Sequence, residues 1–342
     1  MKDILKKLPK IELHCHLDGS VRPETMYELL LEEGEDMEDI SLEQFEKMAK
    51  VVDECNSLVE YLERFSYPLK VMQRKENIER ITYELLEDLS KQNVKYVEIR
   101  FAPFLFMEKG LSFDESVESV LKGMERAKGD FNILSNAILV CMRHENVEKS
   151  IELVEKGEKF LGKGVVAVDL AGAEEGFPPE NHKEAFDLAY KKGYNITVHA
   201  GETGRHENIA KSIELLHAER IGHGIAAIKS PEVMELIKNK NIFLEMCPIS
   251  NLQTKAVELL DEYPIKEFLD NDILVTVNTD NTTVSNTSLD KEYELLIDGL
   301  GFSIEDIIKL IKNSTEATFL PKEEKAYLKR IIENGLENLK SS

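Results

Sequence analysis

Two kinds of hydrophobic pattern alternate along this chain. Short runs rich in apolar and β-branched residues, each followed by Gly, Pro or a polar cluster, are typical of buried strands. Eight such runs are predicted to be strands: Lys10–His14, Val94–Phe101, Ile133–Met142, Val165–Leu170, Asn195–His199, Arg220–Gly222, Ile242–Met246 and Ile273–Asn278. Between them, apolar residues at helical spacing predict helices such as Phe113–Lys128, Lys149–Leu161, Lys183–Lys192 and Asn208–His217.

This alternation determines the predicted fold class. Strands separated by helices pair in parallel, and eight of them favour an α/β fold of the (β/α)8 TIM-barrel type. A doubly wound open sheet is the alternative. However, no Gly-x-Gly-x-x-Gly motif follows the first predicted strand, so the best signature of a dinucleotide-binding sheet is missing.

The interval between the first and second predicted strands is far longer than one crossover connection requires. Ser20–Lys91 has the pattern of several helices, and one of them, Leu58–Phe65, carries apolar residues at helical spacing. We therefore expect a single domain over residues 1–342, with residues 20–91 as a helical insert. Because the insert leaves from the C-terminal end of a strand, it is expected to form a lid over the barrel mouth. Extra core packing is the simpler alternative.

Composition narrows the possible partners and the location. The 342 residues include 43 Lys and Arg against 65 Asp and Glu, a formal net charge of −22. That charge argues against binding to nucleic acid polymers or anionic membranes. Four cysteines without paired spacing predict reduced, buried thiols. No secretory signal and no run of ~20 apolar residues is visible, so a cytoplasmic location is expected.

His14 and His16, at the end of the first predicted strand, form the most informative motif. Side chains alternate faces along a strand, so these two imidazoles point to the same side and can bind one divalent metal ion. Three further strand ends carry metal-ligand residue types: His199, the glycine-flanked His223 and Asp280. In a TIM barrel these ends meet at the C-terminal face, where the active sites of this fold lie.

The chemistry of these residues favours a zinc hydrolase. One Zn²⁺ ion per chain, with an open position for water, suits a set of three histidines and one aspartate: His14, His16, His199 and Asp280. Glu202 and His223 remain for proton transfer, Glu202 as an acid and His223 as the residue that takes or steers the proton of the water. Simpler alternatives are a helix N-terminal carboxylate for Glu202 and a turn histidine for His223. The other histidines are interpreted as structural or solvent-facing: His144, His182, His206 and His217.

Over nearly its whole length the chain closely resembles the adenosine deaminase family, the zinc aminohydrolases of the amidohydrolase-like barrel group. The motifs that carry the resemblance occur in order: PKIELHCHLDGS, YVEIRFAP, CMRH, VDLAGAE, TVHAGET, RIGHG, CPISN and VNTDN. The resemblance implies purine salvage by hydrolytic deamination of adenosine and 2′-deoxyadenosine to inosine and deoxyinosine. It also implies that Glu202 protonates purine N1 and that His223 orients or deprotonates the attacking water.

The resemblance further implies contacts to a small-molecule purine nucleoside. Gly172 matches a backbone contact to purine N3, and Asp18 matches a hydrogen bond to the ribose, with His16 near the 5′-hydroxyl. An apolar helix that caps the substrate is matched by Leu58, Tyr61, Leu62 and Phe65. Animal members have a second aspartate where this chain has Asn281. Its amide NH2 can still donate to the N7 acceptor, so altered affinity and retained activity are expected.

Three alternatives stay open. Adenine deaminase and aminodeoxyfutalosine deaminase resemble this family, although Asp18 favours a substrate with a ribose. A dinuclear amidohydrolase generally uses a carboxylated lysine at the end of the fourth strand, and Val168–Gly172 contains no lysine. A non-catalytic nucleoside-binding protein usually lacks a metal ligand or the acid, and all of these positions are present. The oligomeric state is not predicted.

Overall fold

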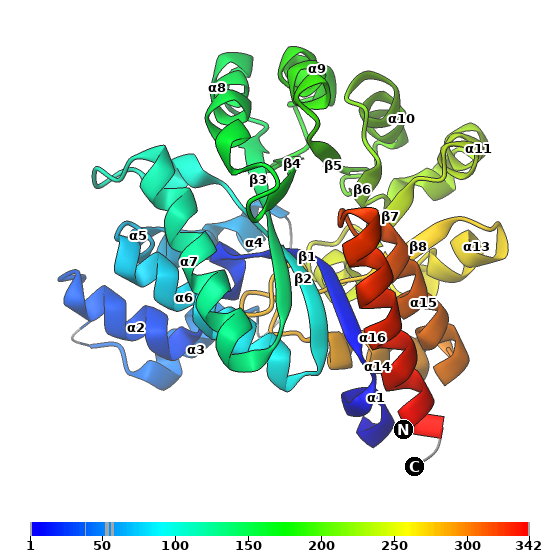
Figure 1. The fold of residues 1–342 in the computed structure, drawn as a ribbon, viewed down its shortest axis with the longest axis horizontal. Helices are drawn as coiled ribbons and strands as arrows, with labels where there is room; N and C mark the ends of the chain where they lie inside the picture. The colour runs from blue at the N-terminus through cyan, green and yellow to red at the C-terminus, as the bar shows by residue number, and fades with distance from the viewer. Residues whose placement is uncertain (1, 38, 52–54, 56–57, 341–342) are drawn as a thin grey trace.

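Eight parallel strands form the centre of the molecule in the computed structural model, which describes residues 2–37, 39–51, 55 and 58–340 (Figure 1). The strands are β1 (Lys10–His16), β2 (Val94–Phe101), β3 (Leu134–Met142), β4 (Val165–Ala171), β5 (Asn195–Ala200), β6 (Arg220–His223), β7 (Phe243–Met246) and β8 (Leu274–Val277). Each pairs with the next in sequence order. Beyond β8, the Asp280 N–H donates to the His14 carbonyl and the His16 N–H donates to the Asp280 carbonyl, both at 2.8 Å. The predicted TIM barrel is confirmed, and the doubly wound open sheet is excluded.

Helices surround the barrel and complete the alternation with the strands (Figure 1). Ser112 and Ser303 begin two of them with capping boxes. The predicted helices at Lys149 and Asn208 each begin two residues earlier than expected, and Asn146 caps the first of these. After β2 the helices are α7 (Phe113–Phe131), α8 (Val147–Gly157), α9 (Lys183–Lys192), α10 (His206–Leu215), α11 (Pro231–Lys240), α12 (Pro248–Gln253), α13 (Ile265–Asp270), α14 (Leu289–Leu300), α15 (Ile304–Ala317) and α16 (Lys322–Lys340).

The chain before β2 is also helical on both sides of β1. Helix α1 (Lys2–Lys7) precedes β1, and the long segment after it contains α2 (Pro23–Glu32), α3 (Leu42–Ala49), α4 (Leu58–Leu62), α5 (Ser66–Val71) and α6 (Lys75–Lys91). The expected helix over Leu58–Phe65 is divided into α4 and a 3-10 turn at Glu63–Phe65. The Tyr61 hydroxyl on α4 lies 2.6 Å from Oγ of Ser285, which follows β8. This contact ties the segment to the C-terminal face of the barrel.

Paired charges fill the interior of the barrel. Arg100 donates to Asp169 Oδ2 at 2.9 Å and to Glu245 Oε2 at 2.8 Å, while Arg220 contacts Glu245 Oε1 at 2.7 Å and Glu98 Oε2 at 2.6 Å. All five residues are buried. Buried charges are costly unless they are paired. In this network each arginine contacts carboxylates of opposite charge, so the charges can be buried together. The network also presents Asp169 and Glu245 to the histidines above them.

Two simpler expectations concern the thiols and the membrane. All four cysteines are buried thiols, as predicted. Within the described residues, no helix is both long and apolar enough to cross a lipid bilayer.

Candidate active site and metal centre

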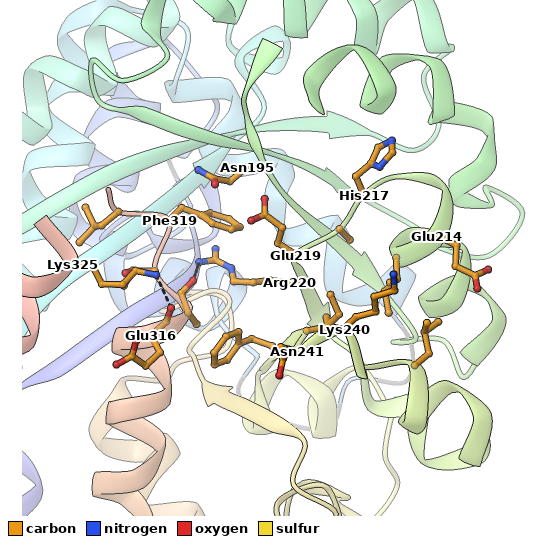
Figure 2. A pocket seen from close by; sticks show the side chains of 18 residues that line it. Asn195, Glu214, His217, Glu219, Arg220, Lys240, Asn241, Glu316, Phe319 and Lys325 are labelled. Carbon is orange, nitrogen blue, oxygen red and sulfur yellow. Dashed lines mark hydrogen bonds between the residues drawn. The ribbon is translucent and has the colours of Figure 1, made fainter. Parts of the chain in front are cut away.

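Two cavities lie at opposite ends of the barrel. The larger, of 650 Å³, lies at the N-terminal strand ends, where Asn195 and Arg220 begin β5 and β6 (Figure 2). Two of its cations, Arg220 and Lys325, already have protein partners. The Arg220 guanidinium lies 3.7 Å from the Phe319 ring centroid, and the Lys325 ammonium donates to the Glu316 carbonyl at 2.7 Å. Conserved chemistry in a TIM barrel sits at the opposite face, so this cavity is a weak candidate.

The second cavity, of 340 Å³, opens at the C-terminal face and gathers most of the predicted site residues. Its lining includes His16, Asp18, Tyr61, Leu62, Phe65, Gly172, His199, Glu202, His223, Asp280 and Asn281. Leu58 begins α4, but its side chain lies outside the described part of the structure. His144, interpreted from the sequence as structural or solvent-facing, has a half-exposed side chain that also lines this cavity.

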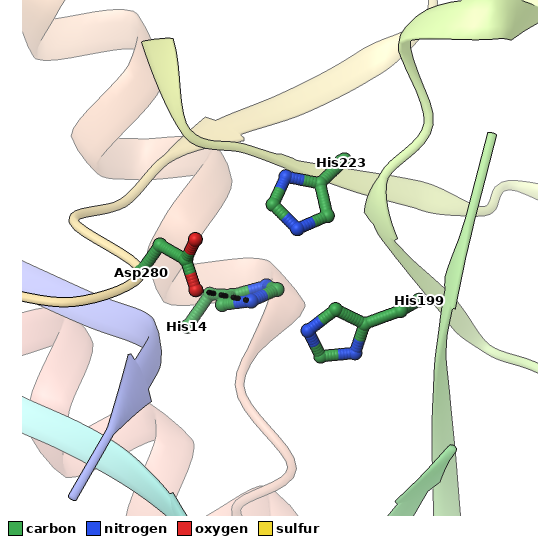
Figure 3. Close-up of side chains that lie close together, drawn as sticks. All are labelled: His14, His199, His223 and Asp280. Atoms are coloured by element: carbon green, nitrogen blue, oxygen red, sulfur yellow. Dashed lines mark ion pairs between the residues drawn. The ribbon is translucent and has the colours of Figure 1, made fainter. Parts of the chain in front are cut away.

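Metal-ligating side chains converge in this second cavity. One ligand atom from each of His14, His199, His223 and Asp280 lies within 4.8 Å of the others, and Figure 3 shows these side chains turned toward a common centre. His16 joins them, because its Nε2 lies 3.2 Å from Nε2 of His199 and 3.4 Å from Oδ1 of Asp280. All four predicted ligands therefore lie together, with His223 as a fifth member of the cluster.

The spacing of the ligand atoms fits coordination to a single metal ion. Bonds of about 2.0–2.1 Å place neighbouring ligand atoms about 3–3.5 Å apart. Nε2 of His14 and Nε2 of His16 each lie 3.4 Å from Oδ1 of Asp280. Nε2 of His14 is also buried without a hydrogen-bond partner, and such an atom is costly unless something completes its coordination. This cluster can therefore hold a metal ion.

Buried carboxylates orient two of these histidines. Glu245 Oε2 lies 2.8 Å from Nδ1 of His14, and Asp169 Oδ2 lies 3.0 Å from Nδ1 of His199. Burial alone would raise the pKa of Asp169, but the neighbouring His199 ring and Arg100 guanidinium hold it below its usual value. An ionised carboxylate keeps the proton on Nδ1, so Nε2 is free to bind a metal ion.

The backbone is strained at Asp280 and His223. Their φ angles are +61° and +62°, in the left-handed region that costs of order 1–3 kcal/mol for residues other than glycine. The Ser250 hydroxyl donates to Oδ2 of Asp280 at 2.6 Å, so only Oδ1 faces the cluster. Before His223, a Cβ at Gly222 would lie 3.0 Å from Cε1 of His14. A larger residue there would push against a metal-ligating ring.

Glu202 and His223 lie beside the metal cluster. Glu202 is 9% exposed, and burial together with the charge of Asp280 raises its pKa to about 7. Its Oε2 lies 3.8 Å from Nε2 of His223. Burial lowers the pKa of His223 to about 4, so this ring is neutral at pH 7. Because the Tyr263 hydroxyl donates to Asn251 Oδ1, the Asn251 amide donates to Nδ1 of His223 at 2.9 Å, and the ring proton stays on Nε2.

Five further residues of the site were given no role from the sequence, although all except Glu245 lie within the quoted motifs: Arg100, Asp169, Glu245, Ser250 and Asn251. Asp169 and Glu245 stand between apolar neighbours in buried strands, so the period-two pattern could have marked them as interior-facing. Ser250 and Asn251 lie in α12, directly after β7. Their place in the CPISN motif was the available signal, since their residue types alone do not separate them from ordinary helix-initiating residues.

Comparison with known proteins agrees with this geometry. Residues 9–334 match the family model for adenosine deaminase. An adenosine deaminase from Clostridium kluyveri is 52% identical over 324 residues, which cover 95% of this chain and 93% of that protein. Adenine deaminase from Arthrobacter aurescens has a TM-score of 0.89 at 25% identity, covering 96% of this chain and 99% of that one. The N6-methyl-AMP deaminase from Arabidopsis thaliana has a TM-score of 0.86 at 28% identity, with 98% of each chain covered.

Proposed function

This chain belongs to the adenosine deaminase family, and we propose that it deaminates the nucleosides adenosine and 2′-deoxyadenosine to inosine and deoxyinosine, with release of ammonia. Purine deamination is supported by the family match and by relatives about half identical to this chain. The observation that carries the choice of a nucleoside is the make-up of the C-terminal cavity. Glu202 and the metal cluster meet there with Asp18, and no Lys or Arg is among the described lining residues.

For the metal ion we propose zinc, one per chain, held by His14, His16, His199 and Asp280. The ligand spacing and the nitrogen-rich set support this choice. Burial also lowers the pKa of His16 well below its usual value, and a ligating imidazole must be neutral. When bound, zinc supplies Lewis acidity and lowers the pKa of a water molecule toward ~7.

Proton handling is proposed for Glu202 and His223. A pKa near 7 keeps much of the Glu202 carboxyl protonated at neutral pH, so it can donate a proton to purine N1. His223 presents its Nε2 proton to the attacking water and fixes its position. The Gly172 backbone and the Asn281 amide are proposed to contact N3 and N7. A Cβ at Gly19 would lie 1.7 Å from Oδ1 of Asn281, so only glycine leaves Asn281 its place in the cavity.

Asp18 is proposed to select a ribose without a phosphate. Its side chain lines the cavity, and burial raises its pKa to about 6. A carboxylate accepts hydrogen bonds from sugar hydroxyls, whereas phosphate binding usually depends on Arg or Lys. The described lining contains neither, so a 5′-phosphate would meet an acidic residue and no cation. We therefore expect adenosine to be preferred to AMP.

The apolar wall of the cavity is proposed to cap the purine. Tyr61, Leu62 and Phe65, from α4 and the turn that follows it, line the same cavity as the metal ligands. Tyr61 is buried, whereas Phe65 is partly exposed. In this role the insert of residues 20–91 covers the mouth of the barrel and limits the access of water to the purine.

The test compares kcat/KM of the zinc-loaded protein on adenosine, adenine and AMP. We expect adenosine to exceed both others by at least about 10²-fold, because a buried group built to bind a sugar hydroxyl is left unpaired by adenine. A preference for adenine would favour the second candidate, an adenine deaminase, to which the fold is similar. Absence of turnover on all three would favour a non-catalytic nucleoside-binding protein.

A further inference from the structure

Glu174 is a buried carboxylate that belongs neither to the lining of the C-terminal cavity nor to the metal cluster. It lies just beyond β4 and is 3% exposed. Its Oε1 accepts the Gly201 N–H at 2.8 Å and the Asn208 amide at 2.8 Å. Its Oε2 accepts the Thr203 N–H at 3.0 Å and the Thr203 hydroxyl at 2.8 Å. Two of these four donors are the backbone groups immediately before and after Glu202.

The local sheet geometry explains why such a side chain is needed. β4 and β5 pair only at Ala167–Asn195 and Val168–Ile196, so the two strands are not paired where they approach the site. The backbone beyond β5 then turns at Gly201, with φ +77°. An unpaired buried N–H costs about 1–3 kcal/mol. Glu174 supplies the acceptors that a neighbouring strand would otherwise provide.

We propose that Glu174 is a positioning residue for the reaction, fixing the turn that carries the Glu202 carboxyl toward the purine. This inference rests on the proposed function of Glu202 and adds the residue through which its position is set. Four donors occupy both oxygens, so the carboxylate has no capacity left for substrate. The nearby charge also contributes to raising the pKa of Glu202, after burial and Asp280. Glu174 thus acts on the substrate only through its neighbour.

Glu174→Gln is the direct test, because the amide keeps the size of the side chain but replaces one acceptor oxygen with an NH2 donor. Whichever oxygen becomes the NH2, one backbone N–H beside Glu202, that of Gly201 or that of Thr203, then faces a donor. At equal zinc content we expect kcat on adenosine to fall about 10- to 100-fold, with KM changed by less than about threefold. The matched control is Glu175→Gln next to it, whose side chain is 81% exposed, and we expect it to stay within about twofold of wild type. Wild-type kcat in Glu174→Gln would overturn the inference.

A double variant separates positioning from general stability. In a Glu202→Gln background the acid is already lost, so adding Glu174→Gln is expected to slow the enzyme by no more than about threefold. If the decrease in kcat of the double variant equals the product of the two single decreases, Glu174 acts independently of Glu202, and the inference is overturned. If Glu174→Gln does not fold, Thr203→Val removes one donor. We expect it to lower kcat by about threefold to tenfold, and an unchanged kcat would contradict the proposal.

Hydrogen exchange gives a readout that does not need turnover. We expect the backbone amides of residues 201–205 to exchange at least about tenfold faster in Glu174→Gln than in Glu175→Gln. Equal exchange would overturn the role of Glu174 even in a protein that deaminates adenosine. Conversely, faster exchange in a zinc-loaded protein without turnover would support the role of Glu174 in the turn while the proposed function fails. The two failures are therefore distinguishable.

Discussion

Both ends of the barrel carry charged and ionisable side chains, but the partners of these side chains differ. At the N-terminal end, Arg220 lies over Phe319 and contacts Glu98, while Lys325 donates to a backbone carbonyl. At the C-terminal end, Nε2 of His14 is buried without a hydrogen-bond partner, and Asp280 holds a left-handed backbone. The cavity at the N-terminal end is nevertheless the larger one. The convergence of metal-ligand atoms on one point, rather than cavity volume, therefore marks the site where chemistry is expected.

Removal of the metal ion is expected to lower activity more than any other change. The expected loss comes from the C-terminal end of the barrel, where the metal cluster lies. Dialysis of the zinc-loaded protein against a chelator should lower deamination of adenosine on the order of 10³-fold or more, because the ion activates the water. Added Zn²⁺ should restore the rate, measured as ammonia released per chain. Full activity in protein shown by mass spectrometry to hold less than about 0.01 metal per chain would contradict the assignment of the cluster.

Phe319→Ala tests the N-terminal end with a change that should affect stability alone. Phe319 is 8% exposed and packs against the Arg220 guanidinium. Its truncation is expected to lower the free energy of unfolding by about 3–5 kcal/mol, measured by urea denaturation. The kcat and KM of the folded variant should stay within about twofold of wild type. A large loss of kcat/KM with unchanged stability would show that this end takes part in the reaction.

Phe65→Ala makes the same substitution at the C-terminal end, with the opposite expectation. Phe65 lines the cavity and is only partly buried, so its loss should change the unfolding midpoint little. Loss of its contact with substrate is expected to raise KM for adenosine about tenfold, equivalent to about 1.4 kcal/mol of binding. If only the thermal stability changes and KM does not, the lid role of this segment is wrong.

Glu292 provides a smaller, pH-dependent contrast, since it is buried and lines neither of the two cavities. Burial raises its pKa from 4.5 to about 8. Between these values the folded protein holds a proton that the unfolded chain releases, so this stabilisation is complete below about pH 4.5 and is lost as the pH rises toward 8. Glu292→Gln is neutral at every pH. Its free energy of unfolding relative to wild type should therefore improve by about 1 kcal/mol or more from pH 5 to pH 8.

The control for this pH-dependent stability measurement is the rate of adenosine deamination. We expect Glu292→Gln to retain wild-type kcat on adenosine at both pH values, because the Glu292 carboxyl accepts from the Thr287 hydroxyl and the Ile249 N–H, and neither of these residues lines the C-terminal cavity. A stability difference that does not change with pH would contradict the assigned protonation state of the buried carboxyl.

The site was predictable where one strand end carries the chemistry. His14 and His16 share a face because strands alternate, and β1 extends through both residues. The partners that orient the ligands were not predictable in the same way. Glu245 contacts His14 across 231 residues of sequence, and that contact depends on the register of all the paired strands around the barrel. Local spacing also gave no indication that β4 and β5 separate near Glu174, because strand pairing is not encoded in either segment alone.

The most direct test of the central claim is the rate of ammonia release from adenosine by wild type and by Glu202→Gln at the same zinc content. The amide has nearly the same shape but no proton to give to N1. We predict that wild type forms one ammonia per inosine and that Glu202→Gln is slower on the order of 10³-fold, with zinc fully retained. A Glu202→Gln rate within about tenfold of wild type, or no turnover by zinc-loaded wild type, would contradict the account.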